Sequence, residues 1–77
     1  MAKPSPAHAG NDLLVKIGNN IRRIRLSKGL SQEALALNSG IDRSYIGGIE
    51  RGEHNVAVIN LEKITIALDT PIANLFK

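Results

Sequence analysis

Basic side chains gather in one half of this 77-residue chain, where they could neutralise the phosphates of a nucleic acid. The segment from Lys16 to Arg51 holds seven basic and three acidic residues, a net charge of +4, whereas the rest of the chain has a net charge of −1. A solvated basic face with no ligand would have the same composition. The charge alone therefore leaves both nucleic-acid binding and an ordinary surface open.

The residue types that enzymes use for catalysis are present but are not arranged for it. His8 and His54 fall in segments predicted to be loops, and the chain has neither the metal-ligand spacing His-Glu-x-x-His nor a glycine-rich phosphate loop. The carboxylates are scattered, and so small a core hardly provides a substrate pocket. Cysteine is absent, which excludes disulfides and thiolate zinc sites. We expect no enzyme activity, metal site, cofactor or small-molecule ligand.

Apolar periodicity predicts that helices carry the basic residues. From Asp12 onward, apolar side chains recur at steps of three and four residues, which indicates an amphipathic helix that Gly29 ends. The segment before it, residues 1–11, holds two prolines and no periodic pattern. We expect a flexible arm there, followed by one domain over residues 12–77. No apolar run approaches the roughly 20 residues of a membrane span, so a soluble intracellular protein is expected.

A second and a third helix are predicted on either side of a turn that contains glycine. Ser31 is a natural N-cap for a helix from Gln32 to about Asn38, and Asp42 caps the next helix, which Gly52 closes. Between them, Gly40 can adopt a positive φ without steric cost, so the chain can turn sharply. A short helix, a tight turn and a second helix make up a helix-turn-helix, whose second helix can enter the major groove of DNA.

Two more helices are predicted towards the C-terminus. One runs from about Ile59 to Leu68, and Thr70-Pro71 begins a short fifth helix in which Ile72 and Leu75 are expected to be buried. The chain shows no convincing strand and no internal repeat. These patterns predict an all-α fold, a compact bundle of five short helices.

Three stretches of this chain match the motifs of a known family. They are Leu30-Ser31-Gln32-Glu33-Ala34-Leu35-Ala36, Gly40-Ile41 and Tyr45-Ile46-Gly47-Gly48-Ile49-Glu50-Arg51-Gly52. With these motifs the chain resembles, over about residues 16–77, the Cro/C1-type (XRE-like) bacterial and phage repressors. Within that family, Asp42-Arg43-Ser44-Tyr45-Ile46 and Gly48-Ile49-Glu50-Arg51 most resemble the controller proteins of restriction–modification systems. The resemblance implies a lambda-repressor-like DNA-binding fold. It also implies a transcription regulator in the cytoplasm of a bacterium or phage host, associated with the nucleoid.

The resemblance also implies roles for individual side chains. Arg43 and Ser44 match the exposed first turn of the family's recognition helix and are expected to contact bases. An arginine there can bind guanine O6 and N7 for about 1–3 kcal/mol of discrimination. A solvated arginine, or one paired with Asp42, is the alternative. Arg25 and Glu50 match a partly buried ion pair between the first and third helices. Contacts to the DNA backbone are expected from Gln32, Tyr45, Arg22, Arg23, Arg51 and Asn55.

Gly47 and Gly48 depart from the family pattern, because related proteins often carry side chains at these positions. Each glycine costs about 1 kcal/mol relative to alanine inside a helix. We expect the groove-facing edge of the third helix to be bare here, which allows either a closer approach of its backbone to DNA or tight packing against a neighbouring helix. A bare edge also favours an alternative function, a protein-interaction or antitoxin-like module with the same fold.

Ile66 is the second departure, because the family usually has a polar residue at this position, and Ile59 lies beside it. At about 100° per residue they lie together on the side of the fourth helix opposite its apolar stripe. An exposed isoleucine pair on so small a protein suggests an interface, so we expect a two-fold homodimer in which Phe76 participates. Such a dimer would present two recognition helices about 34 Å apart to a roughly palindromic site in double-stranded DNA.

Overall fold

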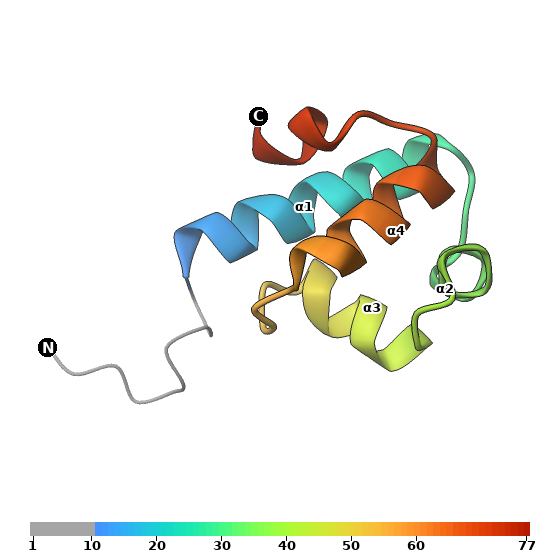
Figure 1. Ribbon diagram of the computed structural model, residues 1–77, viewed down its shortest axis with the longest axis horizontal. Coiled ribbons are helices and arrows are strands. Elements are labelled where there is room, and N and C mark those ends of the chain that lie inside the picture. Colours follow the sequence, from blue (N-terminus) through green and yellow to red (C-terminus); the bar gives the residue numbers. More distant parts are fainter. Residues whose placement is uncertain (1–10) are drawn as a thin grey trace, which may run out of the picture.

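The computed structural model describes residues 11–77, and the arm predicted over residues 1–11 lies outside this part of the chain except for Asn11. The described residues form four α-helices and one 3₁₀ helix, with no strand. Figure 1 shows how these elements are arranged. The elements are α1 (Asp12–Ser27), α2 (Gln32–Ser39), α3 (Arg43–Glu50), α4 (Val58–Leu68) and the 3₁₀ helix η1 (Ile72–Phe76). Over residues 11–77, no helix has the length and apolar character needed to cross a membrane.

Polar caps and glycines set the ends of the first three helices close to the predicted positions. The side chains of Asn11, Ser31 and Asp42 each accept hydrogen bonds from backbone amides in the first turn of the helix that follows. Gly29 and Gly40 have φ values of 72° and 73°, and the chain leaves α1 and α2 through them. Local sequence signals therefore fix where the helix-turn-helix begins and turns.

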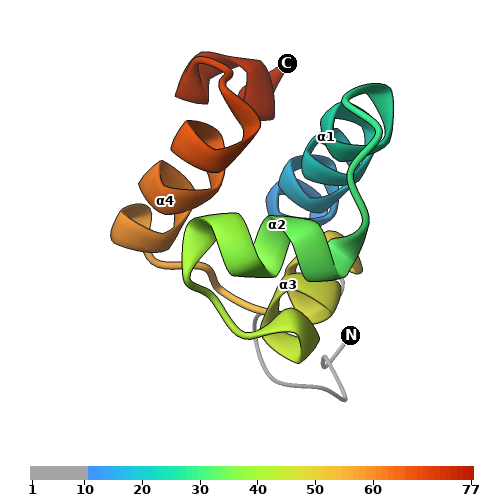
Figure 2. The ribbon, with the colours of Figure 1, turned by 90° about the vertical axis from the view of Figure 1, so that its right-hand side faces the viewer.

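The core is built from aliphatic side chains, and each of the five elements contributes at least one of them. Helix α1 packs against α3 and η1, and α2 packs against α3 and α4; Figure 2 shows α2 in front of α3, with α1 and α4 on either side. The two helices α1 and α3 approach closely because Gly18 faces the backbone oxygens of Ile49 and Glu50. The buried core residues are Ile17, Ile21, Ile24, Leu35, Ile41, Ile46, Ile49, Val56, Leu61, Ile64, Leu68 and Leu75.

The fifth element differs from the prediction in type and in part of its burial. It is a 3₁₀ helix rather than an α-helix. Leu75 is fully buried as predicted, but the prediction for Ile72 is wrong, because 41% of this side chain is exposed. Leu75 lies where η1 packs on α1, and Asn20 of α1 donates a hydrogen bond to its carbonyl oxygen at 2.8 Å. Ile72 instead lines an open groove beside α4.

Candidate nucleic-acid interface

The N-terminal end of α3 is exposed and carries the two residues predicted to contact bases. Arg43 and Ser44 both lie on the surface, while Ile46, Ile49 and Glu50 turn into the protein. Asp42 caps this end by accepting from both the backbone amide and the hydroxyl of Ser44. These two bonds, led by the hydroxyl, lower the pKa of Asp42. Since the Ser44 hydroxyl donates to Asp42, it faces solvent as a hydrogen-bond acceptor.

The predicted ion pair between the first and third helices is present and almost completely buried. Arg25 Nε lies 2.6 Å from Glu50 Oε2, and the exposed fractions of the two side chains are 7% and 2%. A second bond joins Arg25 to Glu50 Oε1 at 3.0 Å, and Arg25 also donates to the Leu30 carbonyl at 2.8 Å. The bond with the Glu50 carboxylate raises the pKa of Arg25. Arg25 thus fastens α1 to α3 and to the start of the helix-turn-helix.

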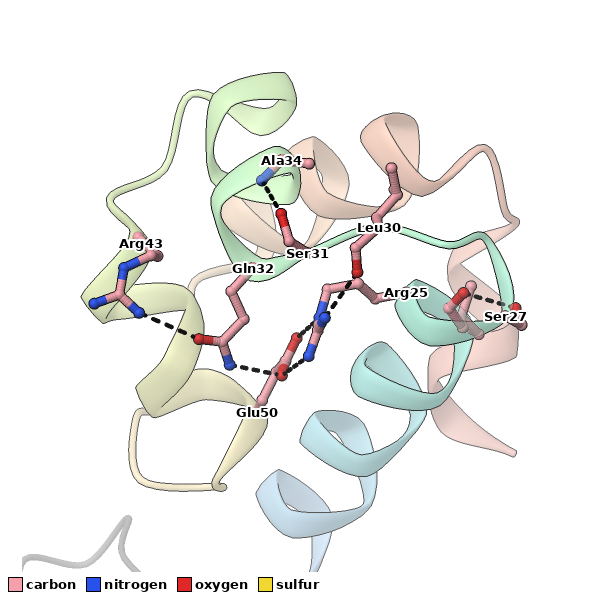
Figure 3. A network of polar contacts seen from close by, with 9 residues as sticks. Arg25, Ser27, Leu30, Ser31, Gln32, Ala34, Arg43 and Glu50 are labelled. Carbon is pink, nitrogen blue, oxygen red and sulfur yellow. Dashed lines mark hydrogen bonds and ion pairs between the residues drawn. The ribbon is translucent and has the colours of Figure 1, made fainter.

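Gln32 connects this ion pair to the exposed end of α3, as Figure 3 shows. Its side-chain nitrogen donates to Glu50 Oε1 at 3.0 Å, and its oxygen accepts a longer bond of 3.5 Å from Arg43. Gln32 was predicted to contact a DNA phosphate. Its amide is already oriented by two protein partners, and one N–H of the NH₂ group remains for such a contact. The same bonds hold the Arg43 guanidinium beside α2.

The glycine-bearing edge of α3 is covered, and the prediction of a bare edge is wrong. The ring of His54, from the loop after α3, occupies the space that a Cβ at Gly48 would need. That ring also stacks on Tyr45, with 4.7 Å between the ring centroids and 21° between the planes. Gly47 is overlaid by Arg51, since a Cβ there would lie 3.1 Å from the guanidinium. Both glycines are consequently buried.

His54 is therefore a residue of this surface that the sequence analysis missed. Its position in a loop, outside any metal-ligand pattern, gives no sign of this contact in the sequence. Two adjacent glycines on the outer side of a recognition helix were the available signal, because a close-packed protein fills such a gap with a neighbouring side chain. Among the described residues, no group of three or more His, Cys, Asp and Glu side chains could hold a metal ion.

Arg51 lies on the surface at the end of α3 and is paired with a carboxylate. It donates to Glu53 through Nε at 3.0 Å and through a second nitrogen at 3.2 Å. This pairing raises the pKa of Arg51 and lowers that of Glu53. Both side chains are more than half exposed, so the pair adds little to stability. A phosphate that approached Arg51 would compete with Glu53 for the same N–H groups.

The other residues predicted to contact the DNA backbone do not all lie on one side. Arg22 and Asn55 are exposed. Arg23 lies about 140° around α1 from Gly18, which faces α3. Its guanidinium donates at 3.3 Å to Asn20, the residue that holds η1. Arg23 is thus turned away from α3, and a contact from it to DNA bound at α3 is not supported by its position.

Comparison with known proteins shows that this chain is similar to helix-turn-helix proteins. Residues 21–75 match a family model described as helix-turn-helix. Control protein C.MunI of a Mycoplasma species is 40% identical over 67 residues, which cover 86% of this chain and 90% of the relative. Control protein C.BamHI of Bacillus amyloliquefaciens is 48% identical over 59 residues, 75% of this chain and 73% of that protein. This chain also superposes on the crystal structure of the restriction-modification controller protein C.AhdI from Aeromonas hydrophila, with a TM-score of 0.80. The two are 54% identical in sequence, and the match covers 82% of this chain and 96% of C.AhdI.

Proposed function

The chain belongs to the helix-turn-helix family of DNA-binding transcription regulators, and from that membership we propose that it controls a restriction–modification system by binding a roughly palindromic operator as a homodimer. Among its relatives are the control protein C.MunI, which matches 86% of the chain, and the restriction-modification controller protein C.AhdI, which matches 82% of it. In the proposed complex, α3 enters the major groove and α2 lies across the phosphate backbone.

The observation that carries this proposal is the placement of Arg43. It stands on the first turn of α3, exposed, with Gln32 holding one of its nitrogens. A guanidinium fixed in this way presents its remaining N–H groups to solvent, where a guanine can accept two of them through O6 and N7. The chain Arg43–Gln32–Glu50–Arg25 connects this group to the buried core through one long, exposed bond to Gln32, which favours this position before DNA binds.

The second copy in the proposed dimer would cover the outer side of α4 and η1. Val58, Ile59 and Ile66 on α4 are 73%, 61% and 72% exposed, and Ile72 and Phe76 on η1 are 41% and 44% exposed. A groove of about 390 Å³ runs between the two elements, lined by Val58, Ile59, Glu62, Thr65 and Ile72. So much clustered apolar surface on a small chain favours burial against an identical surface, as in a two-fold interface.

The rival function, a protein-interaction module, drew support from the bare edge of α3. That support is gone, because His54 and Arg51 cover the edge, and the Arg51 guanidinium keeps N–H groups beyond those that donate to Glu53. A surface of this kind suits the acceptor-rich grooves and phosphates of DNA.

Selection from a random duplex library tests the proposal. The protein should enrich a two-fold symmetric site, and its affinity should fall steeply as the salt concentration rises. In a plot of log affinity against log salt concentration, each phosphate that is neutralised should contribute about −0.9 to the slope. Arg43→Ala should relax the preference at one base pair in each half-site. Arg23→Ala removes the same charge on the side of α1 turned away from α3 and should leave the site unchanged. Enrichment of no sequence would refute DNA recognition.

A further inference from the structure

Asp42 determines where the proton of the Ser44 hydroxyl lies. The backbone amide of Ser44 donates to Asp42 Oδ2 at 3.0 Å, and the Ser44 hydroxyl donates to the same oxygen. The direction of the second bond follows from its chemistry, because an ionised carboxylate has no proton to give. The bond from the hydroxyl, and after it the bond from the amide, lowers the pKa of Asp42. The carboxylate therefore stays charged at neutral pH and keeps the hydroxyl proton.

The side of the Ser44 hydroxyl that faces solvent is consequently a hydrogen-bond acceptor and not a donor. Ser44 is exposed on the first turn of α3. A phosphate oxygen is an acceptor too, so a hydroxyl in this state makes no favourable bond with the DNA backbone. In the major groove, the donors are the exocyclic amino groups of adenine and cytosine, whereas guanine O6 and thymine O4 are acceptors.

We propose that Asp42 is a positioning residue for DNA specificity: it holds the Ser44 hydroxyl as an acceptor, so that Ser44 selects an adenine or cytosine amino group and rejects a guanine or thymine oxygen. This inference rests on the proposed function, since it assumes that the first turn of α3 lies in the major groove. Arg43 and Ser44 then have complementary roles on the same turn. Arg43 has only donors and suits guanine O6 and N7, whereas Ser44 offers only an acceptor.

The first experiment finds the base pair that Ser44 contacts, with the duplex that the wild-type protein selects as the ligand. Repeating the selection with Ser44→Ala should relax the preference at one base pair in each half-site. At that pair in one half-site, adenine is then replaced by purine, or cytosine by 2-pyrimidinone, because these analogues lack the amino group. The wild type should bind the altered duplex about 5-fold more weakly, the loss expected for one hydrogen bond. Ser44→Ala should bind both duplexes equally.

The second experiment tests the carboxylate with Asp42→Ala and Asp42→Asn. Exchanging A·T for G·C, or the reverse, at the same pair puts an oxygen where the amino group was. The wild type should lose about 10-fold in affinity, because two acceptors then face each other. In Asp42→Ala the hydroxyl is free to turn its proton towards that oxygen, so most of this loss should disappear. Asp42→Asn keeps an oxygen that accepts from Ser44 and should show the wild-type loss.

Each variant is compared on two duplexes, so the loss of the helix cap in Asp42→Ala, which weakens binding to both, cancels in the ratio. Circular dichroism confirms that each variant is folded. Asp42→Ala combined with Ser44→Ala should discriminate between the two duplexes no less than Ser44→Ala does. A further fall would show that Asp42 contacts the base itself, and the positioning role would be refuted.

The outcomes separate this inference from the proposed function. If the wild-type protein selects a duplex but Ser44→Ala relaxes no base pair, or the amino group can be removed without loss, the Ser44 contact is refuted and the proposed function stands. If Asp42→Ala keeps the full loss on exchange of the base pair, Asp42 does not set the polarity of Ser44. If the wild-type protein selects no duplex, both fail.

Discussion

Gln32 donates a hydrogen bond to Glu50 Oε1 over 3.0 Å, the same oxygen that accepts a nitrogen of Arg25. Because Gln32 also accepts a bond from Arg43, this one amide joins the exposed start of α3 to the buried ion pair between α1 and α3. Gln32 stands at the first position of α2, so both helices of the helix-turn-helix share the connection. Stability and the proposed DNA recognition are therefore linked at a single side chain.

Gln32→Ala should weaken DNA binding while changing stability little. Glu50 keeps its two bonds to Arg25, so the fold loses only one partly exposed hydrogen bond, about 0.5–1.5 kcal/mol. Arg43 loses its protein partner and must be ordered by the DNA. We expect a several-fold rise in Kd, measured by fluorescence anisotropy, and a smaller effect of Gln32→Ala once Arg43 is alanine. Asn38→Ala, an exposed amide on the same helix, is the control and should bind as the wild type does.

Removing either partner of the buried ion pair should destabilise the fold far more. Arg25→Ala leaves the Glu50 carboxylate buried and Glu50→Ala leaves the guanidinium buried, and an uncompensated charge of this kind costs about 3–5 kcal/mol. Urea unfolding monitored by circular dichroism measures the loss. Arg25→Met combined with Glu50→Leu should lose less than the two alanine variants together, because no charge is then left unpaired.

The exposed pair Arg51–Glu53 provides the comparison for this prediction. It also has two bonds between a guanidinium and a carboxylate, but both side chains are more than half exposed. Glu53→Ala should leave the urea midpoint unchanged within error, since solvent screens the charges. A shift as large as that of Glu50→Ala would show that burial is not what makes the Arg25–Glu50 pair strong.

The sequence alone predicted most of the fold and the elements of the site. Caps and glycines act over a few residues, so Ser31, Asp42 and Gly40 marked the helix-turn-helix to within a residue or two. The helical spacing of apolar side chains likewise predicted which faces are buried. The pairing of Arg25 with Glu50 was inferred from family resemblance, because a 25-residue separation carries no local signal.

Three features depend on tertiary packing and escaped the sequence analysis. The covering of Gly48 requires the loop after α3 to fold back over the helix, which no periodic pattern records. The orientation of Arg23 follows from where η1 lies against α1. Ile72 is predicted to be buried because it is apolar and lies one turn from Leu75, but its side chain lines the open groove beside α4. Each depends on how one element packs against another, which a periodic pattern within a single element does not record.

Alanine substitutions at two helical glycines, Gly18 and Gly47, should change the stability of the fold in opposite directions. A methyl group at Gly18 would overlap the backbone oxygens of Ile49 and Glu50, which cannot move without separating α1 from α3. We expect Gly18→Ala to lower stability by about 1–3 kcal/mol or more. At Gly47 the nearest atom belongs to the flexible end of Arg51, so Gly47→Ala should gain up to about 1 kcal/mol of helix propensity. Thermal unfolding compares the two, and equal effects would contradict the close contact at Gly18.

The lowered pKa of Asp42 predicts an acid-dependent contribution to stability. Its carboxylate accepts from the hydroxyl and the amide of Ser44, which favours the charged form in the folded state. A depressed pKa stabilises the fold above the ordinary aspartate value of about 4, and this contribution is lost as the pH falls through the lowered value. Asp42→Asn keeps a capping acceptor but does not titrate here.

Thermal unfolding of the wild type and Asp42→Asn from pH 2 to pH 7 checks this. The wild type should have the higher melting temperature from pH 5 to pH 7, and the difference should shrink below about pH 4. A difference that stays constant down to pH 2 would show that the charge of Asp42 does not contribute to the cap.

The proposed dimer predicts that a charge on the outer side of α4 separates the two copies. Ile66 is 72% exposed, so Ile66→Glu should be tolerated in the folded monomer, whereas in a two-fold interface it places two carboxylates against apolar surface. Sedimentation at micromolar concentration should show a dimer for the wild type and a monomer for Ile66→Glu. Affinity for a full palindrome should fall to near that for a half-site, because the two recognition helices are no longer linked.

Leu37→Glu is the matched control, because Leu37 is 83% exposed on α2, outside the α4–η1 groove. It should remain dimeric at the same concentration. If the wild type sediments as a monomer, or if both variants dissociate equally, the α4–η1 surface is not the interface. Phe76 is 44% exposed on η1 but does not line the groove, so Phe76→Ala distinguishes a broad interface from one confined to α4 and Ile72. A broad interface predicts weaker dimerisation for Phe76→Ala, since the second copy then buries less apolar surface.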